Sequence, residues 1–297
     1  MKSALTADVA ERILYDVAGR LSLDVSGARL LGPVGDNAVY LLPREHTVAR
    51  IAQELASDRV ERELRVAAWL AEQEFPAVHA VAGIRQPVRN NGHIVTFWRE
   101  IPDPVQASTS QMGVLLRHLH ALPVPPDGLI GRLDPFVRLA EHIEEATGIS
   151  EDERAFLAER LTVLMDAHAK LVFTMPMGVV HGDAHRKNVV RDAAGRVLLL
   201  DLERFGIGQP EWDLIVPAVY LRVGWYDEDT YRAFADAYGY DIREWDGYPV
   251  LAELRELRMT SWLAARTGRE PRLIPEARKR ITSLKDPSAE RRWTPGT

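Results

Sequence analysis

The chain has 297 residues, of which 46% are hydrophobic and 27% charged, so it can bury the core of one large globular domain or of two smaller ones. It has no cysteine, which excludes disulfides, thiolate metal sites and cysteine nucleophiles and fits a reducing compartment. No apolar run matches a signal peptide or a membrane span, and the net charge of −6 argues against nucleic acid, so we expect a cytoplasmic protein without a membrane or nucleic-acid partner.

The first predicted elements are a helix and a strand pair. Apolar side chains at helical spacing predict a helix over residues 7–21. Residues 30–42 predict two strands around a glycine-containing turn that includes Gly35 and Asn37. Backbone without a Cβ can approach phosphates closely, so this turn is a candidate nucleotide-binding flap. An ordinary hairpin turn has the same sequence features, and only the basic strand that follows favours the flap.

The basic strand covers residues 46–52. Period-two alternation places Val48 and Arg50 on one face of it. The guanidinium of Arg50 is a planar fork that suits phosphate oxygens, whereas on an edge strand it would simply be solvated. The next segment, residues 54–74, predicts a helix with an apolar stripe beside Glu63.

An Asn-Gly turn between two β-rich runs predicts a further hairpin, whose second strand contains Phe97 and Trp98. Free backbone groups from Phe97 to Arg99 are expected to bond a purine edge, although both aromatic side chains also fit a core. Prolines follow this strand. We therefore expect a β-rich N-terminal lobe over residues 1–99 and a mostly helical lobe over residues 100–297.

Helical spacing of apolar side chains dominates the second lobe. It predicts helices over residues 108–122, 134–147, 151–173, 227–238, 242–267 and 275–284, and a further helix that begins at Pro210. The chain has no internal repeat and no low-complexity tract. The fold class expected from these elements is α+β.

The most informative stretch is the polar loop His181–Asn188, with the sequence HGDAHRKN. An apolar strand precedes it, and a hairpin follows whose second strand ends in Asp201. We expect the hairpin to hold Asp183, Asn188 and Asp201 at the rim of a buried sheet, with all three side chains pointing to one place. This set of side chains suits phosphoryl transfer. One carboxylate can orient a hydroxyl, and an amide and a second carboxylate can hold magnesium on nucleotide phosphates.

Two other interpretations of this loop are open. Asp and Asn are common turn formers, but turn chemistry does not explain a carboxylate that closes an apolar strand. Alternation would also place His181, Asp183 and His185 on one face, as ligands of a hydrolytic metal. No second His/Asp cluster with ligand spacing completes such a site, so phosphoryl transfer is the favoured interpretation.

The order of an Asp, four residues, an Asn and then a metal-binding Asp after a strand is that of the protein-kinase catalytic loop. Here His-Gly-Asp replaces the kinase His-Arg-Asp, and the sequence DLE at Asp201–Glu203 replaces Asp-Phe-Gly. Together with GQPEWDL at residues 208–214, these features resemble the aminoglycoside phosphotransferase family of small-molecule kinases. The resemblance covers about residues 30–214, is specific only in the catalytic stretch, and implies a protein-kinase-like two-lobe fold.

The resemblance implies a role for each candidate residue. Asp183 would orient or deprotonate the acceptor hydroxyl, and Asn188 and Asp201 would bind Mg²⁺ on the phosphates of ATP or GTP. Arg50, where the family usually has lysine, would clamp the phosphates while paired with a glutamate from the following helix, and Glu63, beside the buried stripe, is the expected partner. The expected nucleotide-binding residues are Gly35, Asn37, Val48, Arg50, Glu63, Phe97 and Trp98.

The expected acceptor is a small molecule with a hydroxyl group. An antibiotic, phosphorylated for resistance or self-protection, is the favoured assignment. The alternatives are a metabolic substrate, such as a sugar or a choline-like alcohol, and a non-catalytic nucleotide-binding protein, which the arginine at position 50 motivates. The sequence leaves open both the choice between ATP and GTP and the oligomeric state.

Acidic residues after Asp201 favour a cationic acceptor over a neutral one. In the resembled family the helices that follow this position line the acceptor pocket, and an acidic wall there would attract a cation. The acidic residues are Glu203, Glu211, Asp213, Asp227, Glu228, Asp229, Asp236, Asp241, Glu244 and Asp246. Solvated helix surfaces would carry the same charges. Asp213 is expected either to brace the catalytic-loop backbone or only to favour the helix N-terminus where it lies.

Overall fold

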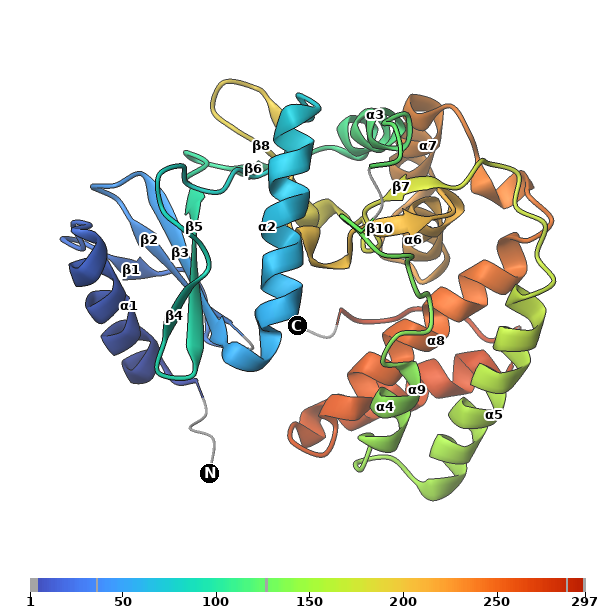
Figure 1. The fold of residues 1–297 in the computed structure, drawn as a ribbon. Coiled ribbons are helices and arrows are strands. Elements are labelled where there is room, and N and C mark those ends of the chain that lie inside the picture. The colour runs from blue at the N-terminus through green and yellow to red at the C-terminus, as the bar shows by residue number, and fades with distance from the viewer. Residues whose placement is uncertain (1–4, 36, 126–127, 287, 296–297) are drawn as a thin grey trace. The chain divides into compact units, whose positions relative to one another are not determined.

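The computed structural model describes residues 5–35, 37–125, 128–286 and 288–295 (Figure 1). The chain packs into two compact units. The first unit contains Met1–Ala107, Pro125–Gly131 and Lys187–Phe205, and the second contains Ser108–Val124, Arg132–Arg186 and Gly206–Thr297. Each unit is therefore assembled from three segments of the chain.

The first unit is built on a five-stranded antiparallel sheet. In sheet order the strands are β1 (Arg29–Leu30), β2 (Asn37–Leu42), β3 (Thr47–Gln53), β5 (His93–Arg99) and β4 (Val88–Asn90). β3 lies between β2 and β5, so Arg50 is not on an edge strand. The register pairs Arg50 with Val39 and Thr96, and Ala49 with Phe97. Because side chains alternate along a strand, Phe97 and Arg50 lie on opposite faces of the sheet.

Helices cover both faces of this sheet (Figure 1). α1 (Ala7–Leu21) packs its buried apolar stripe against the face that carries Phe97. A short 3₁₀ turn, η1 (Glu54–Ala56), leads into α2 (Ser57–Glu72), which packs on the face of Arg50 through Val60. The strands and helices predicted for this part of the chain are confirmed to within a few residues.

A second sheet of the first unit contains the predicted hairpin. Its strands are β6 (Val105–Gln106), β8 (Val189–Arg191) and β9 (Val197–Leu199), with β8 in the middle. The Asp192 carboxylate accepts a hydrogen bond from the Arg196 amide at 2.8 Å, and Gly195 takes a φ of 83° that closes the turn. The hairpin that follows the polar loop is therefore confirmed.

The second unit is mostly helical. Its helices are α3 (Thr109–His120), α4 (Leu139–Glu144), α5 (Glu151–His168), α6 (Glu211–Arg222), α7 (Glu228–Tyr238), α8 (Tyr248–Arg266) and α9 (Ile274–Lys285). Two short strands, β7 (Gly178–Val180) and β10 (Gly206–Gly208), pair antiparallel. Within the described residues, no helix is both long and apolar enough to cross a membrane.

Several helices are shorter than predicted, and the one expected over residues 242–267 begins only at Tyr248. The helix expected over residues 134–147 is confined to α4, because Arg138 adopts a left-handed conformation, with a φ of 60°, directly before it. The helix expected over residues 151–173 ends at His168. Beyond it the ring of Phe173 packs against both His168 and Trp245, at centroid distances of 5.7 and 5.3 Å, and this packing requires the chain to leave the helix.

Candidate active site

The candidate residues form two groups, one within each unit. In the first unit, Arg50 on β3 makes a bidentate ion pair with Glu63 on α2. The Nη1–Oε1 distance is 3.0 Å, and the Glu63 side chain is 3% exposed. The predicted pairing of these two residues is confirmed. Each Nη nitrogen keeps a second N–H, so the guanidinium can still donate to phosphate oxygens while Glu63 holds it.

The same helix is tied to the segment after Asp201. Arg59 on α2 donates to the Glu203 carboxylate at 2.8 Å, and Arg62 donates to the Glu203 carbonyl at 2.7 Å. Burial raises the pKa of Glu203, and the nearby Asp201 and Glu63 carboxylates raise it further. Glu203 is thus part of the first unit and anchors η3 (Leu202–Arg204) to α2.

Asn188 and Asp201 lie at the same end of the β8–β9 hairpin. The Leu200 amide donates to the Asn188 carbonyl at 2.8 Å, and Asp201 follows directly. Asp201 is exposed and has a φ of 56°, the left-handed region that Asp tolerates better than most residues. Such a conformation costs about 1–3 kcal/mol and is retained mainly at functional sites. The polar groups of two predicted metal ligands are therefore brought to one rim.

The donor set at this rim fits magnesium. Among the described residues, none donates a hydrogen bond to the Asp201 carboxylate, which leaves its oxygens open to a cation. No group of three or more His, Cys, Asp or Glu in the described residues could hold a metal ion by itself. Mg²⁺ is usually held by one or two carboxylates together with substrate phosphates, so Asn188 and Asp201 suit it better than a metal bound by protein alone.

The expected nucleotide-binding residues separate into two sets. Val48 pairs with Trp98 on the sheet face of Arg50, and the Arg50 guanidinium lies 5.6 Å from the Trp98 ring centroid. Phe97 is fully buried in the α1 core on the other face. Its amide donates to the Gln86 side chain at 2.6 Å, and its carbonyl accepts from Val81 at 2.9 Å.

The prediction of free backbone groups at Phe97 to Arg99 is therefore wrong. The Arg99 amide also has a partner, since it donates to the His79 carbonyl at 2.8 Å. In the flap, Asn37 begins β2 and Gly35 is exposed with open space where a Cβ would stand. Asp36 lies outside the described residues. Contact of Gly35, Asn37, Val48 or Trp98 with a nucleotide stays a prediction.

In the second unit, a buried carboxylate fixes the start of the catalytic loop. Asp213 on α6 accepts hydrogen bonds from the amides of His181 and Gly182, at 2.7 and 2.8 Å. His120 on α3 binds the same carboxylate at 3.0 Å through Nε2 and the Tyr238 hydroxyl at 2.8 Å through Nδ1. The predicted brace is confirmed, and His120 is held inside the fold.

Asp183 follows β7, which pairs with β10, so it is not on the hairpin that carries Asn188 and Asp201. That part of the prediction is wrong, and the convergence of the three side chains stays a prediction. The Asp183 Oδ1 accepts a hydrogen bond from Arg255 on α8 at 2.8 Å. Burial opposes ionisation of Asp183, but the Arg255 charge and the nearby His185 and His181 outweigh it and lower its pKa. The sequence contains no local signal for Arg255.

The hydrolytic-metal interpretation does not fit the loop. His181 is fully buried, and its Nδ1 accepts a hydrogen bond from the Asp183 amide at 3.3 Å. His185 lies 3.6 Å from the Asp183 carboxylate through Nε2. With one histidine turned to the backbone and no cluster of three ligands in the described part of the chain, this set does not form a metal site.

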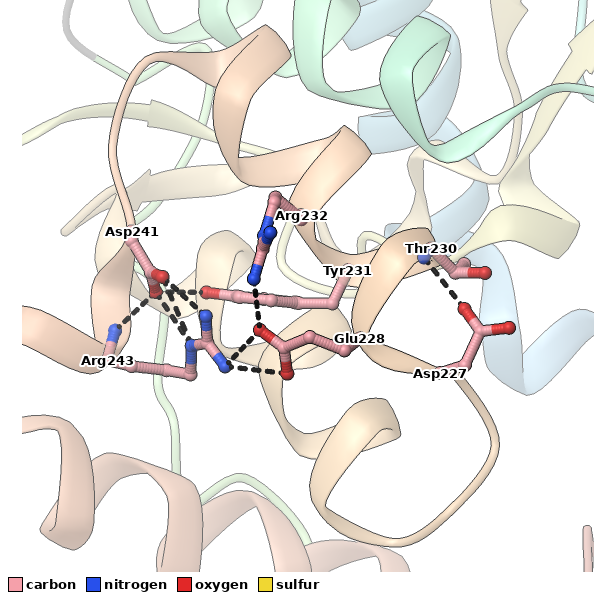
Figure 2. A network of polar contacts seen from close by, with 7 residues as sticks. All are labelled: Asp227, Glu228, Thr230, Tyr231, Arg232, Asp241 and Arg243. Carbon is pink, nitrogen blue, oxygen red and sulfur yellow. Dashed lines mark hydrogen bonds and ion pairs between the residues drawn. The ribbon is translucent and has the colours of Figure 1, made fainter.

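Most of the expected acidic wall is used inside the fold. Glu211 is buried and accepts from the Thr174 and Met175 amides at 2.8 and 3.0 Å. Figure 2 shows a second set around α7, in which Glu228 and Asp241 share Arg243. Asp227 there caps α7 by accepting from the Thr230 amide at 2.8 Å. These residues thus have partners within the chain, and an acidic wall that would attract a cation stays a prediction.

Comparisons with known proteins agree with this description. A sequence profile of the phosphotransferase enzyme family (APH) matches residues 29–257. Amicoumacin kinase hAmiN, solved with AMP-PNP, Ca²⁺ and Ami, is 14% identical, with a TM-score of 0.73 over 94% of this chain and 95% of that one. None of the curated proteins matches the sequence significantly.

Two further solved structures share the fold. APH(2")-IIia, as a GDP and kanamycin complex, is 17% identical, with a TM-score of 0.65 over 93% of this chain and 100% of that one. A choline/ethanolamine kinase family protein from Mesorhizobium loti is also 17% identical, with a TM-score of 0.63 over 93% of each chain. The antiparallel sheet with its helices, and the helical second unit, are thus those of kinase-like folds. The chain therefore belongs to the phosphotransferase enzyme family, the small-molecule kinases that its sequence resembles.

Proposed function

We propose that this protein uses Mg²⁺ and ATP or GTP to transfer the γ-phosphate to a hydroxyl of a small molecule. The observation that carries the proposal is the Asp183 carboxylate, kept ionised by Arg255 in a loop whose backbone Asp213 fixes. A fixed, ionised carboxylate can accept a hydrogen bond from a hydroxyl and aim its oxygen at phosphorus. Membership of the phosphotransferase family supports the same chemistry.

Each residue then has a defined task. Asn188 and Asp201 would hold Mg²⁺, which would balance the charge of the phosphates. Arg50, fixed by Glu63, donates to phosphate oxygens. Asp183 orients the acceptor hydroxyl, whose oxygen forms a bond to the γ-phosphorus while the bond to the bridging oxygen breaks. The nucleoside diphosphate leaves with that electron pair, and the hydroxyl proton is released to solvent.

For the acceptor we propose an antibiotic that is inactivated in the cytoplasm. Two of the similar structures support this class, since one is amicoumacin kinase hAmiN, solved with AMP-PNP, Ca²⁺ and Ami, and another is a complex with kanamycin. A metabolic alcohol is the second candidate, supported by the similarity to the choline/ethanolamine kinase family protein. Glu228 and Asp241 share Arg243, and Glu211 accepts from the Thr174 and Met175 amides, so the acidic residues do not by themselves decide between the two candidates.

A substrate panel tests the proposal. The purified protein, Mg²⁺ and either ATP or GTP are incubated with aminoglycosides, peptide antibiotics, nucleosides, sugars and amino alcohols, and each product is examined by mass spectrometry for one added phosphate. Asp183→Ala is the control, and it should give no adduct. Tight nucleotide binding without transfer to any acceptor and without slow hydrolysis would instead identify a non-catalytic nucleotide-binding protein.

A further inference from the structure

Arg255 on α8 differs from two other arginines of the second unit, the half-buried Arg258 and the buried Arg280. Arg258, one turn further along the same helix, donates to the carbonyls of Pro135 and Val137 at 2.7 and 3.2 Å. Arg280 on α9 donates to the carbonyls of Met259 and Thr294 at 3.2 and 2.6 Å. Both side chains tie distant backbone segments together, which is a purely structural task.

The contacts of Arg255 lead to Asp183 instead. Its Nη2 donates to the Asp183 Oδ1 at 2.8 Å, and the Tyr220 hydroxyl on α6 interacts with the same guanidinium. Its Nε has no hydrogen-bond partner among the described residues. A guanidinium that is 7% exposed loses most of its hydration, and a structural arginine would recover that loss from backbone carbonyls. Arg255 is thus kept buried chiefly for its contact with Asp183.

This contact restrains the orientation of the Asp183 carboxylate. Arg255 holds Oδ1 at 2.8 Å, and His185 Nε2 lies 3.6 Å from Oδ2. We propose that Arg255 is a positioning residue for phosphoryl transfer, which anchors Oδ1 of Asp183 and so sets the direction in which the carboxylate meets the acceptor hydroxyl. The inference rests on the proposed function and adds to it the residue that sets the orientation of the carboxylate.

The contact with Arg255 also affects how Asp183 can act on the hydroxyl. With its pKa lowered by Arg255, Asp183 is a weak base and orients the hydroxyl without keeping its proton. The groups that face Asp183 are Arg255 from α8, Tyr220 from α6, and His181 and His185 from its own loop. Removing the Arg255 charge should raise the pKa of Asp183, so that the acid limb of the kcat/KM profile moves to higher pH.

The first experiment does not depend on activity. Urea unfolding at pH 7 is measured for the wild type, Asp183→Asn, Arg255→Met and the double variant. Asp183→Asn should lower the unfolding midpoint in the wild type, because it leaves Arg255 buried and unpaired, but should not lower it in the Arg255→Met background. Additive shifts in the double variant would overturn the inference, since they would show that the two side chains are not coupled.

The second experiment separates positioning from folding. Arg255→Met should lower kcat up to about 100-fold, leave the KM for the nucleotide unchanged and move the acid limb upward, while Arg255→Lys should move the limb back. Arg280→Met is the matched control, because it removes a buried arginine that has no contact with Asp183. It should lower the unfolding midpoint without moving the limb. A His185→Asn variant identifies any limb that belongs to that histidine.

The outcomes distinguish the two proposals. If Arg255→Met behaves like Arg280→Met, with lower stability and an unchanged kcat and pH limb, Arg255 is structural and the inference is wrong. If the wild type transfers no phosphate while the unfolding cycle still shows coupling, the proposed function fails and the ion pair stands. If the wild type is active but the unfolding shifts are additive, the inference about Arg255 is wrong and the proposed function stands.

Discussion

Each of the two units contains an arginine–carboxylate pair, and the roles of the arginine and the carboxylate are exchanged between them. In the first unit the functional member is the arginine, since Arg50 is the phosphate-binding candidate and Glu63 holds it. In the second the functional member is the carboxylate, since Asp183 is the catalytic candidate and Arg255 holds it. Removing either member strands a partner in a poorly hydrated place, so both pairs should be sensitive to substitution. The difference teaches that the presence of an ion pair does not show which of its members is functional. The contacts of each oxygen and nitrogen show which side chain is held and which one holds it.

The largest loss of activity is expected from a substitution at Asp183. Asp183→Ala should lower transfer about 100- to 10,000-fold, the range for losing a positioned group that handles the reacting hydroxyl. Its nucleotide affinity, measured by calorimetry with Mg²⁺, should stay close to that of the wild type. Asp201→Ala is the contrast, because it should weaken Mg²⁺–nucleotide binding as well. Near wild-type turnover in Asp183→Ala would end the kinase assignment.

At Arg50 the expected loss is smaller. Arg50→Ala should cost about 2–4 kcal/mol in transition-state stabilisation, judged from kcat/KM, because a charged donor to the phosphates is lost. Arg50→Lys should recover only part of this, since an ammonium cannot make the two-point contact with Glu63. Full activity in both variants would mean that another group binds the phosphates.

A change at Asp213 tests the loop beneath the second pair. Asp213→Asn keeps the shape but replaces one acceptor oxygen with an NH₂ group, which cannot accept from the His181 or Gly182 amide. The free energy of unfolding should fall by about 1–3 kcal/mol, the cost of leaving a buried donor without a partner. Chemical denaturation measures this, and an unchanged midpoint would show that the loop keeps its shape without the brace.

The smallest effect is expected at Arg59. Its contact with Glu203 is partly exposed, with side chains 37% and 29% accessible, so Arg59→Met should change stability by only about 0.2–1 kcal/mol. The Arg50–Glu63 pair should be unaffected, because Arg62 still holds the Glu203 carbonyl. A large loss of activity in Arg59→Met would contradict this prediction. It would show that the contact of Arg59 with Glu203 is needed for activity although both side chains are partly exposed.

The local features of the site could be predicted from the sequence. The hairpin, the pairing of Arg50 with Glu63 and the brace by Asp213 follow from strand periodicity, from one helix stripe and from motif order. The error at Phe97 concerns its backbone groups: Gln86 and Val81 bind its amide and its carbonyl, and the sequence does not show that the segment before the hairpin folds back onto this strand.

Contacts over long sequence separations could not be predicted. Arg255 lies 72 positions after Asp183 on a helix where charged residues are common, and only the packing of α8 brings it to the loop. The acidic residues are a different case, because some of their partners are local. Asp227 accepts a hydrogen bond from the Thr230 amide, and Asp241 binds Arg243, two residues later. Residues close in the sequence therefore already offered partners for these charges.

The contacts of α2 have a consequence for ligand binding in the first unit. Arg59, Arg62 and Glu63 are spaced three and four residues apart, so they lie along one side of the helix. Through them one helix holds both Arg50, the candidate phosphate-binding residue, and the segment after Asp201, the candidate metal ligand. A shift of the helix would therefore change both at once, and nucleotide and cation should each raise the affinity for the other by the same factor, as thermodynamic reciprocity requires.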